Sequence, residues 1–185
     1  MSTSSRPGAA EGDADDVEST ARSLCLRLLT RRAQTRAELA RALARRGVPD
    51  EVAHRVLGRL TAVGLVDDAA VAVSLVTARH RDRGWARGAL GMELRRRGVD
   101  DEDARVALDT VTDRDEADRA RALVARRLPS TRGQPPEVRA RRLVGMLARK
   151  GYPSGLAARV VREALAADAP GDPDLSRGSD VLADE

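Results

Sequence analysis

The chain has 185 residues, with 33 Lys and Arg against 29 Asp and Glu, and it contains no Phe. Leu, Val and Ala must therefore fill any core, and no run of β-branched or aromatic residues alternates as strands require. Ala, Leu and Arg favour helix, so we predict an all-α protein. No segment reaches the roughly 18 to 20 apolar residues of a membrane span, and the polar, acidic N-terminus does not resemble a secretory signal. We expect a cytoplasmic protein.

Charge is distributed unevenly along the chain. Residues 1–18 sum to −4 and residues 168–185 to −5, whereas residues 19–167 carry +13. Both terminal segments lack apolar periodicity, so we expect them to be disordered, with ordered structure beginning near Ser19. The basic body should attract polyanions or an acidic protein surface.

Three helices are predicted before Gly64. The first covers about residues 21–32 and turns Leu24, Leu28 and Cys25 inward. Thr35 and Glu38 match a capping box for the second helix, which Gly47 ends. The third opens at residues 49–50, since proline is tolerated at a helix start, and ends at Gly64.

The stretch 64–98 contains two more helices. Asp67 and Asp68 are the cap and first-turn acid of one helix, where carboxylates meet free N–H groups. Gly84 interrupts the pattern, and a helix opening near Trp85 ends at Gly98. Arginines surround the interruption and precede the final glycine: Arg79, Arg81, Arg83, Arg87, Arg95, Arg96 and Arg97. The acidic run that starts at Asp100 opens the next helix, and further helices are expected over 113–128, 136–150 and 153–167.

An internal repeat becomes visible when Gly47, Gly98 and Gly151 are aligned. A leucine lies four and eight residues before each glycine, and a basic pair directly precedes each. The sequence therefore predicts three tandem three-helix repeats, residues 19–64, 65–112 and 113–167. Because no copy has a large core alone, we expect them to stack in an elongated, curved array.

Enzymatic chemistry finds little support in the sequence. His54 and His80 have no metal-ligand spacing, and Cys25 has no partner for a site. The glycines are isolated helix ends rather than a phosphate-binding loop. We predict a protein without catalysis, cofactor, metal or small-molecule substrate.

The basic pairs before the three glycines have two interpretations. Cations in a last helical turn complement the helix dipole, which explains any single pair. Stacked repeats would also place the pairs in a row suited to a phosphate backbone or an acidic filament. Sequence-specific DNA reading by a helix-turn-helix is disfavoured because the third helices begin with acids. Base stacking is weak as well, since Trp85 and Tyr152 are the only aromatic residues.

The chain resembles the bacterial RecX family over about residues 21–165. The resemblance rests on spaced residues of the second repeat: Gly64, Asp67, Asp68, Gly84, Leu90, Glu93, Leu94 and Gly98. It implies three tandem three-helix repeats and a partner, the RecA recombinase filament on DNA. It also implies that the protein modulates, and mostly inhibits, recombinase and ATPase activities in DNA repair and the SOS response.

We expect the basic residues of the second and third repeats to contact the partner or DNA. They are Arg79, Arg81, Arg83, Arg87, Arg95, Arg96, Arg97, Arg149 and Lys150. The alternative is a basic helical protein that acts directly on single- or double-stranded DNA. A third interpretation is a scaffold that only recruits other proteins.

Overall fold

The computed structural model describes residues 8–169, with side chains from residue 15 onward. Over this range the secondary structure is helical, without a strand, which confirms the all-α prediction. The chain divides into two compact units, residues 1–116 (unit 1) and 117–185 (unit 2). Residues 1–7 and 170–185, where disorder is expected, lie outside the described residues.

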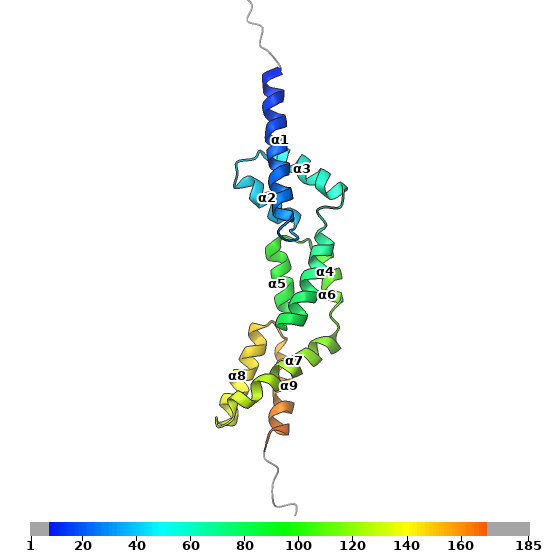
Figure 1. The fold of residues 1–185 in the computed structure, drawn as a ribbon. Helices are drawn as coiled ribbons and strands as arrows, with labels where there is room; N and C mark the ends of the chain where they lie inside the picture. Colours follow the sequence, from blue (N-terminus) through cyan, green and yellow to red (C-terminus); the bar gives the residue numbers. More distant parts are fainter. Residues whose placement is uncertain (1–7, 170–185) are drawn as a thin grey trace, which may run out of the picture. The chain divides into compact units, whose positions relative to one another are not determined.

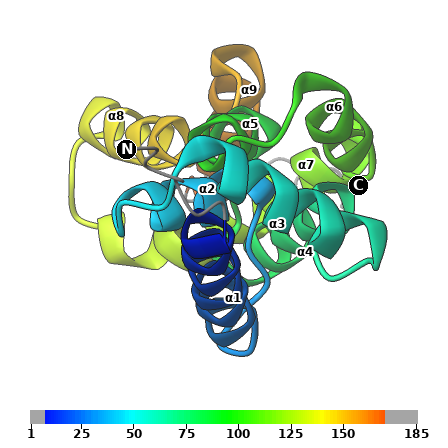
Figure 2. The same ribbon diagram turned by 90° about the horizontal axis from the view of Figure 1, so that it is seen from above.

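The first triplet of helices comprises α1 (Gly8–Leu29), α2 (Arg36–Ala44) and α3 (Asp50–Ala62), and α1 packs against both of the others (Figures 1 and 2). Its core contains Cys25, whose thiol is fully buried, and burial raises its pKa. The other buried core residues are Ala21, Leu39, Leu43, Val52, Ala53, Val56, Leu57, Leu60 and Val66. Leu24 and Leu28 are only partly buried against this core.

Helix α1 begins at Gly8, well before the expected start near Ser19. Residues 8–18, predicted to be disordered, are thus helical as far as the structure describes them. Alanine favours helix, and acids at a helix N-terminus interact well with its dipole, which accounts for the extension. Glu18 also forms ion pairs with Arg55 and Arg59 of α3.

The second triplet comprises α4 (Asp68–Ala78), which continues into a π-helical turn η1 (Arg79–Arg83), α5 (Arg87–Arg97) and α6 (Asp101–Asp109). Helix α6 packs against both α4 and α5, and α4 and α6 run side by side in Figure 1. The buried residues are Ala72, Leu75, Val76, Leu90, Leu94, Val99, Ala104, Ala107 and Val111. This core and that of the first triplet both lie in unit 1.

The third triplet comprises α7 (Asp113–Arg127), α8 (Pro136–Arg149) and α9 (Ser154–Ala167), with a 3₁₀ turn η2 (Leu128–Thr131) after α7. The first turn of α7 falls in unit 1 and the remainder in unit 2. Helices α8 and α9 pack together. Buried residues of unit 2 are Ala117, Ala120, Val124, Thr131, Leu143, Leu147, Tyr152, Ala157, Val160 and Val161.

Asp168 was expected to open a disordered tail, but it is the C-cap of α9. Its carboxylate accepts a hydrogen bond from Arg132 at 2.8 Å and pairs with Arg139. Hydrogen bonds from these two arginines hold the pKa of Asp168 below its ordinary value. The ordered part of unit 2 therefore extends past the end of α9.

The predicted repeat is confirmed by matched positions. The six leucines that precede the three aligned glycines are all fully buried: Leu39, Leu43, Leu90, Leu94, Leu143 and Leu147. Gly47, Gly98 and Gly151 all have left-handed backbones, with φ of 71°, 79° and 84°. The same sequence pattern therefore ends the second helix of each triplet in the same way.

Among the described helices, none is both long and apolar enough to cross a membrane.

Candidate partner-binding groove and the junctions that hold it

Asp68 joins the first two triplets. Its Oδ1 atom accepts a hydrogen bond from the backbone N–H of Arg36 at 2.7 Å. Arg36 is the first residue of α2, where an amide has no acceptor within its own helix. Asp67 instead caps α4, accepting from Ala70 N at 2.8 Å, as predicted. Asp68 thus accepts a hydrogen bond from the preceding triplet rather than from its own helix. Burial of its carboxyl group raises its pKa.

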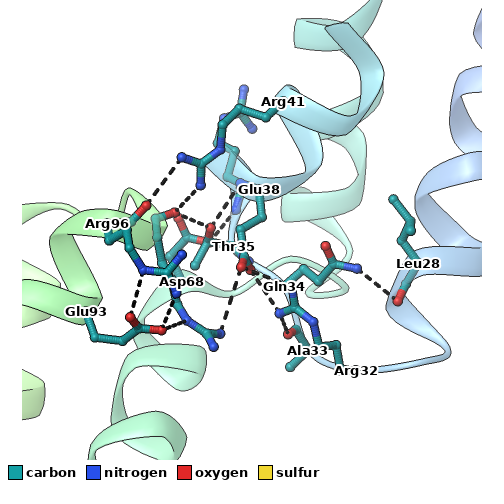
Figure 3. Close-up of polar contacts among 12 residues, drawn as sticks. Leu28, Arg32, Ala33, Gln34, Thr35, Glu38, Arg41, Asp68, Glu93 and Arg96 are labelled. Carbon is teal, nitrogen blue, oxygen red and sulfur yellow. Dashed lines mark hydrogen bonds and ion pairs between the residues drawn. The ribbon is translucent and has the colours of Figure 1, made fainter. Parts of the chain in front are cut away.

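Thr35 and Arg41 bind the end of α5 (Figure 3). Thr35 and Glu38 form the predicted capping box, and the Thr35 hydroxyl also donates to the carbonyl oxygen of Arg97 at 2.7 Å. The Arg41 guanidinium donates to the carbonyl oxygens of Arg96 and Arg97 at 3.3 and 3.2 Å. Carbonyls in a last helical turn lack intrahelical partners, so these bonds satisfy them from the neighbouring triplet.

Glu93 holds two of the predicted binding arginines (Figure 3). Arg96 donates to its carboxylate at 2.8 Å and Arg97 at 3.0 Å. The hydrogen bonds from Arg96 and Arg97 lower the pKa of Glu93 to about 2, against the effect of burial. Arg97 also lies 4.0 Å from Glu38, and its side chain is only 16% exposed. Arg97 is therefore part of the junction between the first two triplets, where α2 meets the end of α5.

Glu38 completes the polar contacts of this junction. Burial alone would raise its pKa, but hydrogen bonds from the Arg32 side chain and the Thr35 amide outweigh burial and lower it. Arg32 donates to both carboxylate oxygens, at 3.1 and 3.2 Å. The loop that carries Arg32 is thereby tied to the start of α2.

Arg87 and Glu116 repeat the arrangement of Arg36 and Asp68. The Arg87 backbone N–H donates to Glu116 Oε1 at 2.7 Å, and its guanidinium contacts Glu116 Oε2 at 3.1 Å and also Asp113. Glu116 is buried in the first turn of α7. In both cases an acid from the next triplet's first helix binds the first amide of α2 or α5. Sequence reasoning missed Glu116 because it looked like any first-turn acid.

A groove of about 520 Å³ opens in unit 1 beside α4 and η1. Val71 and Leu75 contribute apolar surface. Its charged lining comprises Arg32, Arg79, Asp82, Arg83 and Arg97. We call this the α4–η1 groove. It brings together three of the predicted binding residues, Arg79, Arg83 and Arg97.

The groove wall at η1 is held by Trp85. The Arg79 guanidinium lies 5.6 Å from the centre of the Trp85 ring, within the range of a cation–π contact. His80 Nδ1 lies 2.9 Å from the Trp85 carbonyl oxygen. These contacts fix the π-helical turn that presents Arg79 and Arg83.

The remaining predicted residues have separate environments. Arg81 is 74% exposed and pairs with Asp82. Arg95 is exposed and its side chain makes no hydrogen bond or ion pair with any described residue. Arg149 and Lys150 belong to unit 2. The nine predicted cations therefore do not form one continuous surface in unit 1, since two of them belong to unit 2.

Comparison with known proteins follows the same division into triplets. Family models described as the first, second and third three-helix domains of RecX match residues 21–60, 67–108 and 114–161. Regulatory protein RecX of Thermobifida fusca is 55% identical over 154 residues, covering 83% of each chain. Its counterpart from Streptomyces coelicolor is 50% identical over 163 residues, covering 88% of this chain and 86% of the relative.

Two solved structures share the fold. A crystal structure of a regulatory protein RecX aligns with a TM-score of 0.75 at 24% identity, covering 88% of this chain and 81% of that one. RecX from Lactobacillus salivarius aligns with a TM-score of 0.73 at 19% identity, covering 80% and 97%. With three matched domains and relatives at half identity or more over most of their length, this chain belongs to the RecX family of regulatory proteins.

Proposed function

We propose that this protein is a non-enzymatic regulator that binds the RecA filament on DNA and inhibits its recombinase and ATPase activities, acting in DNA repair and the SOS response. Membership of the RecX family through all three triplets supports this role. The observation that carries the proposal is the α4–η1 groove, which presents Arg79 and Arg83 on a fixed turn beside apolar side chains.

The groove suits an acidic protein segment with an apolar contact. Arg79 and Arg83 supply positive charge, while Val71 and Leu75 supply surface that gains from leaving water. Complementary charge speeds encounter and selects the partner. Weak contacts from several triplets to neighbouring RecA protomers would add through effective concentration, so no single contact needs to be strong.

The test measures ATP hydrolysis and strand exchange by RecA of the same organism, with the protein added below stoichiometry. We compare the natural protein with a variant carrying Arg79→Glu and Arg83→Glu. The matched control carries Arg22→Glu and Arg45→Glu, two exposed residues of unit 1 that do not line the groove. We expect inhibition by the natural protein and the control, and at least tenfold weaker inhibition by the groove variant.

Helical circular dichroism and the thermal transition are recorded for all three proteins, since Arg79 also contacts Trp85. No inhibition by the natural protein at any ratio would exclude the regulator. Equal inhibition by both variants would exclude the α4–η1 groove as the site that binds RecA. Inhibition abolished by excess free DNA, without binding to the filament, would favour a protein that acts on DNA directly. A scaffold would produce neither inhibition nor a difference between variants.

A further inference from the structure

Unit 2 contains a second arginine-lined groove, of about 710 Å³, between the end of α7 and one face of α8. Arg127 lines it from α7, Ser130 and Thr131 from η2, and the remaining side chains come from α8: Arg141, Arg142, Met146 and Arg149. Among the described residues, no acid lines this groove. We call it the α7–α8 groove.

The four guanidinium groups of this groove have no ion pair with any described residue. Several arginines elsewhere are held by acids of this chain, as Arg87 is by Glu116 and Arg139 by Asp168. Four like charges around one hollow repel one another, and a bound anion would relieve that repulsion. The α7–α8 groove is therefore the arginine cluster of unit 2 whose charge the described residues leave unneutralised.

Three of the four arginines that line the groove come from α8. Arg142 and Arg149 are seven residues apart, which places them on the same side of the helix and about 10 Å apart along its axis. Gly145 lies between them, and a Cβ there would come within 3.4 Å of Arg149 Nη1.

We propose that the α7–α8 groove binds the phosphate backbone of a nucleic acid, with Arg127, Arg141, Arg142 and Arg149 as phosphate ligands. Guanidinium groups bind phosphate oxygens in a forked geometry, and a row of them along a helix follows a chain of phosphates. The inference goes beyond the proposed function because it requires no RecA.

An acidic protein segment fits this groove less well. Protein partners are anchored by apolar or aromatic side chains that enter pockets, and Met146 is the one such side chain among the described lining residues. Base stacking does not contribute either, because Tyr152, the aromatic residue of unit 2, is 4% exposed. Binding of nucleic acid in this groove should therefore depend on the phosphates and not on the base sequence.

The test measures binding of a fluorescent dT20 oligonucleotide to the full chain by anisotropy, without RecA, across a series of salt concentrations. The groove variant carries Arg141→Gln and Arg142→Gln. The matched control carries Arg159→Gln and Arg162→Gln, two exposed residues of α9 that remove the same charge outside the groove. A third variant, Gly145→Leu, places a side chain against the Arg149 guanidinium without changing charge.

Each phosphate contact to a single strand contributes about −0.7 to the slope of log K against log salt. Loss of two contacts should reduce the slope by about 1.4 and weaken binding about twenty-five-fold at 0.1 M salt. Gly145→Leu should also weaken binding, while the control should stay within about twofold of the natural protein, on the same counterion argument.

Three results would overturn the proposal. They are no binding of dT20 by the natural protein, equal losses in the groove variant and the control, and unchanged binding by Gly145→Leu in a folded protein. Tripolyphosphate at equal phosphate concentration is added as a competitor. Competition as strong as that of unlabelled dT20 would mean that the groove takes free polyphosphate instead. Because RecA is absent, these results are independent of the inhibition assay.

Discussion

Gly98 lies so close to Ala37 that a Cβ atom on Gly98 would come within 2.4 Å of the Ala37 Cβ atom. Gly98 ends α5 in a left-handed conformation, and Ala37 lies in the first turn of α2. The two triplets of unit 1 therefore meet where one residue has no side chain and the other has a single methyl group. This close approach lets Thr35 and Arg41 reach the last carbonyls of α5.

Gly98→Ala should destabilise unit 1 by about 3 kcal/mol. The left-handed backbone accounts for about 1–2 kcal/mol, and overpacking against Ala37 adds a further contribution of about 1–3 kcal/mol. Trp85 is the only tryptophan of the chain and lies in unit 1, so its fluorescence reports guanidinium-induced unfolding of this unit. Gly47→Ala is the matched control, because Gly47 has φ of 71° but no atom within 4 Å of the added Cβ. Equal losses in the two variants would contradict the close approach at Ala37.

Unit 1 should lose stability in acid partly through Glu93. Its pKa in the folded protein is about 2, below the ordinary 4.5, mainly because Arg96 donates a hydrogen bond to it. A depressed carboxyl pKa stabilises the fold above the unfolded-state pKa, and that stabilisation disappears as pH falls from about 4.5 toward 2. Glu93→Gln should therefore lower the free energy of unfolding at pH 7 and flatten its decline below pH 4.5.

Glu102→Gln is the control for this pH dependence. Glu102 pairs with Arg105 on its own helix, and its side chain is 71% exposed. Exposed ion pairs contribute about 0–1 kcal/mol, so the acid limb of this variant should follow that of the natural protein. Denaturant unfolding at intervals between pH 7 and pH 2.5 measures both. If the free energy of unfolding of Glu93→Gln fell with pH in parallel with that of the natural protein, Glu93 would not contribute to the loss of stability in acid.

Arg87 and Arg95 should differ although both were predicted to bind a partner. Arg87→Ala leaves the buried Glu116 carboxylate without its guanidinium, which should cost about 2 kcal/mol. Arg95→Ala removes an exposed side chain without a partner among the described residues, and its effect should be within about 0.5 kcal/mol. Thermal unfolding monitored by Trp85 fluorescence distinguishes them. Equal melting temperatures would show that Glu116 does not need Arg87.

Much of the local structure was predictable because it depends on neighbours in the sequence. The capping box of Thr35 and Glu38, the Asp67 cap and the buried leucines before Gly98 all follow from spacings of three or four residues. The three-triplet organisation followed from aligning glycines. Such features repeat along the chain, so each copy supports the assignment of the others.

The roles of individual arginines could not be obtained in this way. Whether Arg96 or Arg97 faces a partner depends on Glu93 and on how α2 approaches α5, which involves residues more than fifty positions away. The charge pattern also drew attention to Arg95 to Arg97. The arginine cluster of unit 2, which has no ion pair with the described part of the chain, includes Arg127, Arg141 and Arg142, which were not predicted. Spacing indicates a helix face, but only the fold shows which charges are already neutralised.

Helix α8 begins at Pro136 and so differs from α2 and α5 at its first residue. Arg36 and Arg87 lie eleven residues before their aligned glycines, and their amides donate hydrogen bonds to carboxylates outside the helix. Helix α8 is longer, so the aligned Ala140 is inside it, while its first residue is a proline without an N–H. Asp168, just past the end of α9, binds the side chains of Arg132 and Arg139. Contacts of that kind weaken as ionic strength rises, whereas a main-chain amide keeps its acceptor, so added salt should loosen the end of α9 before it separates α2 from α4.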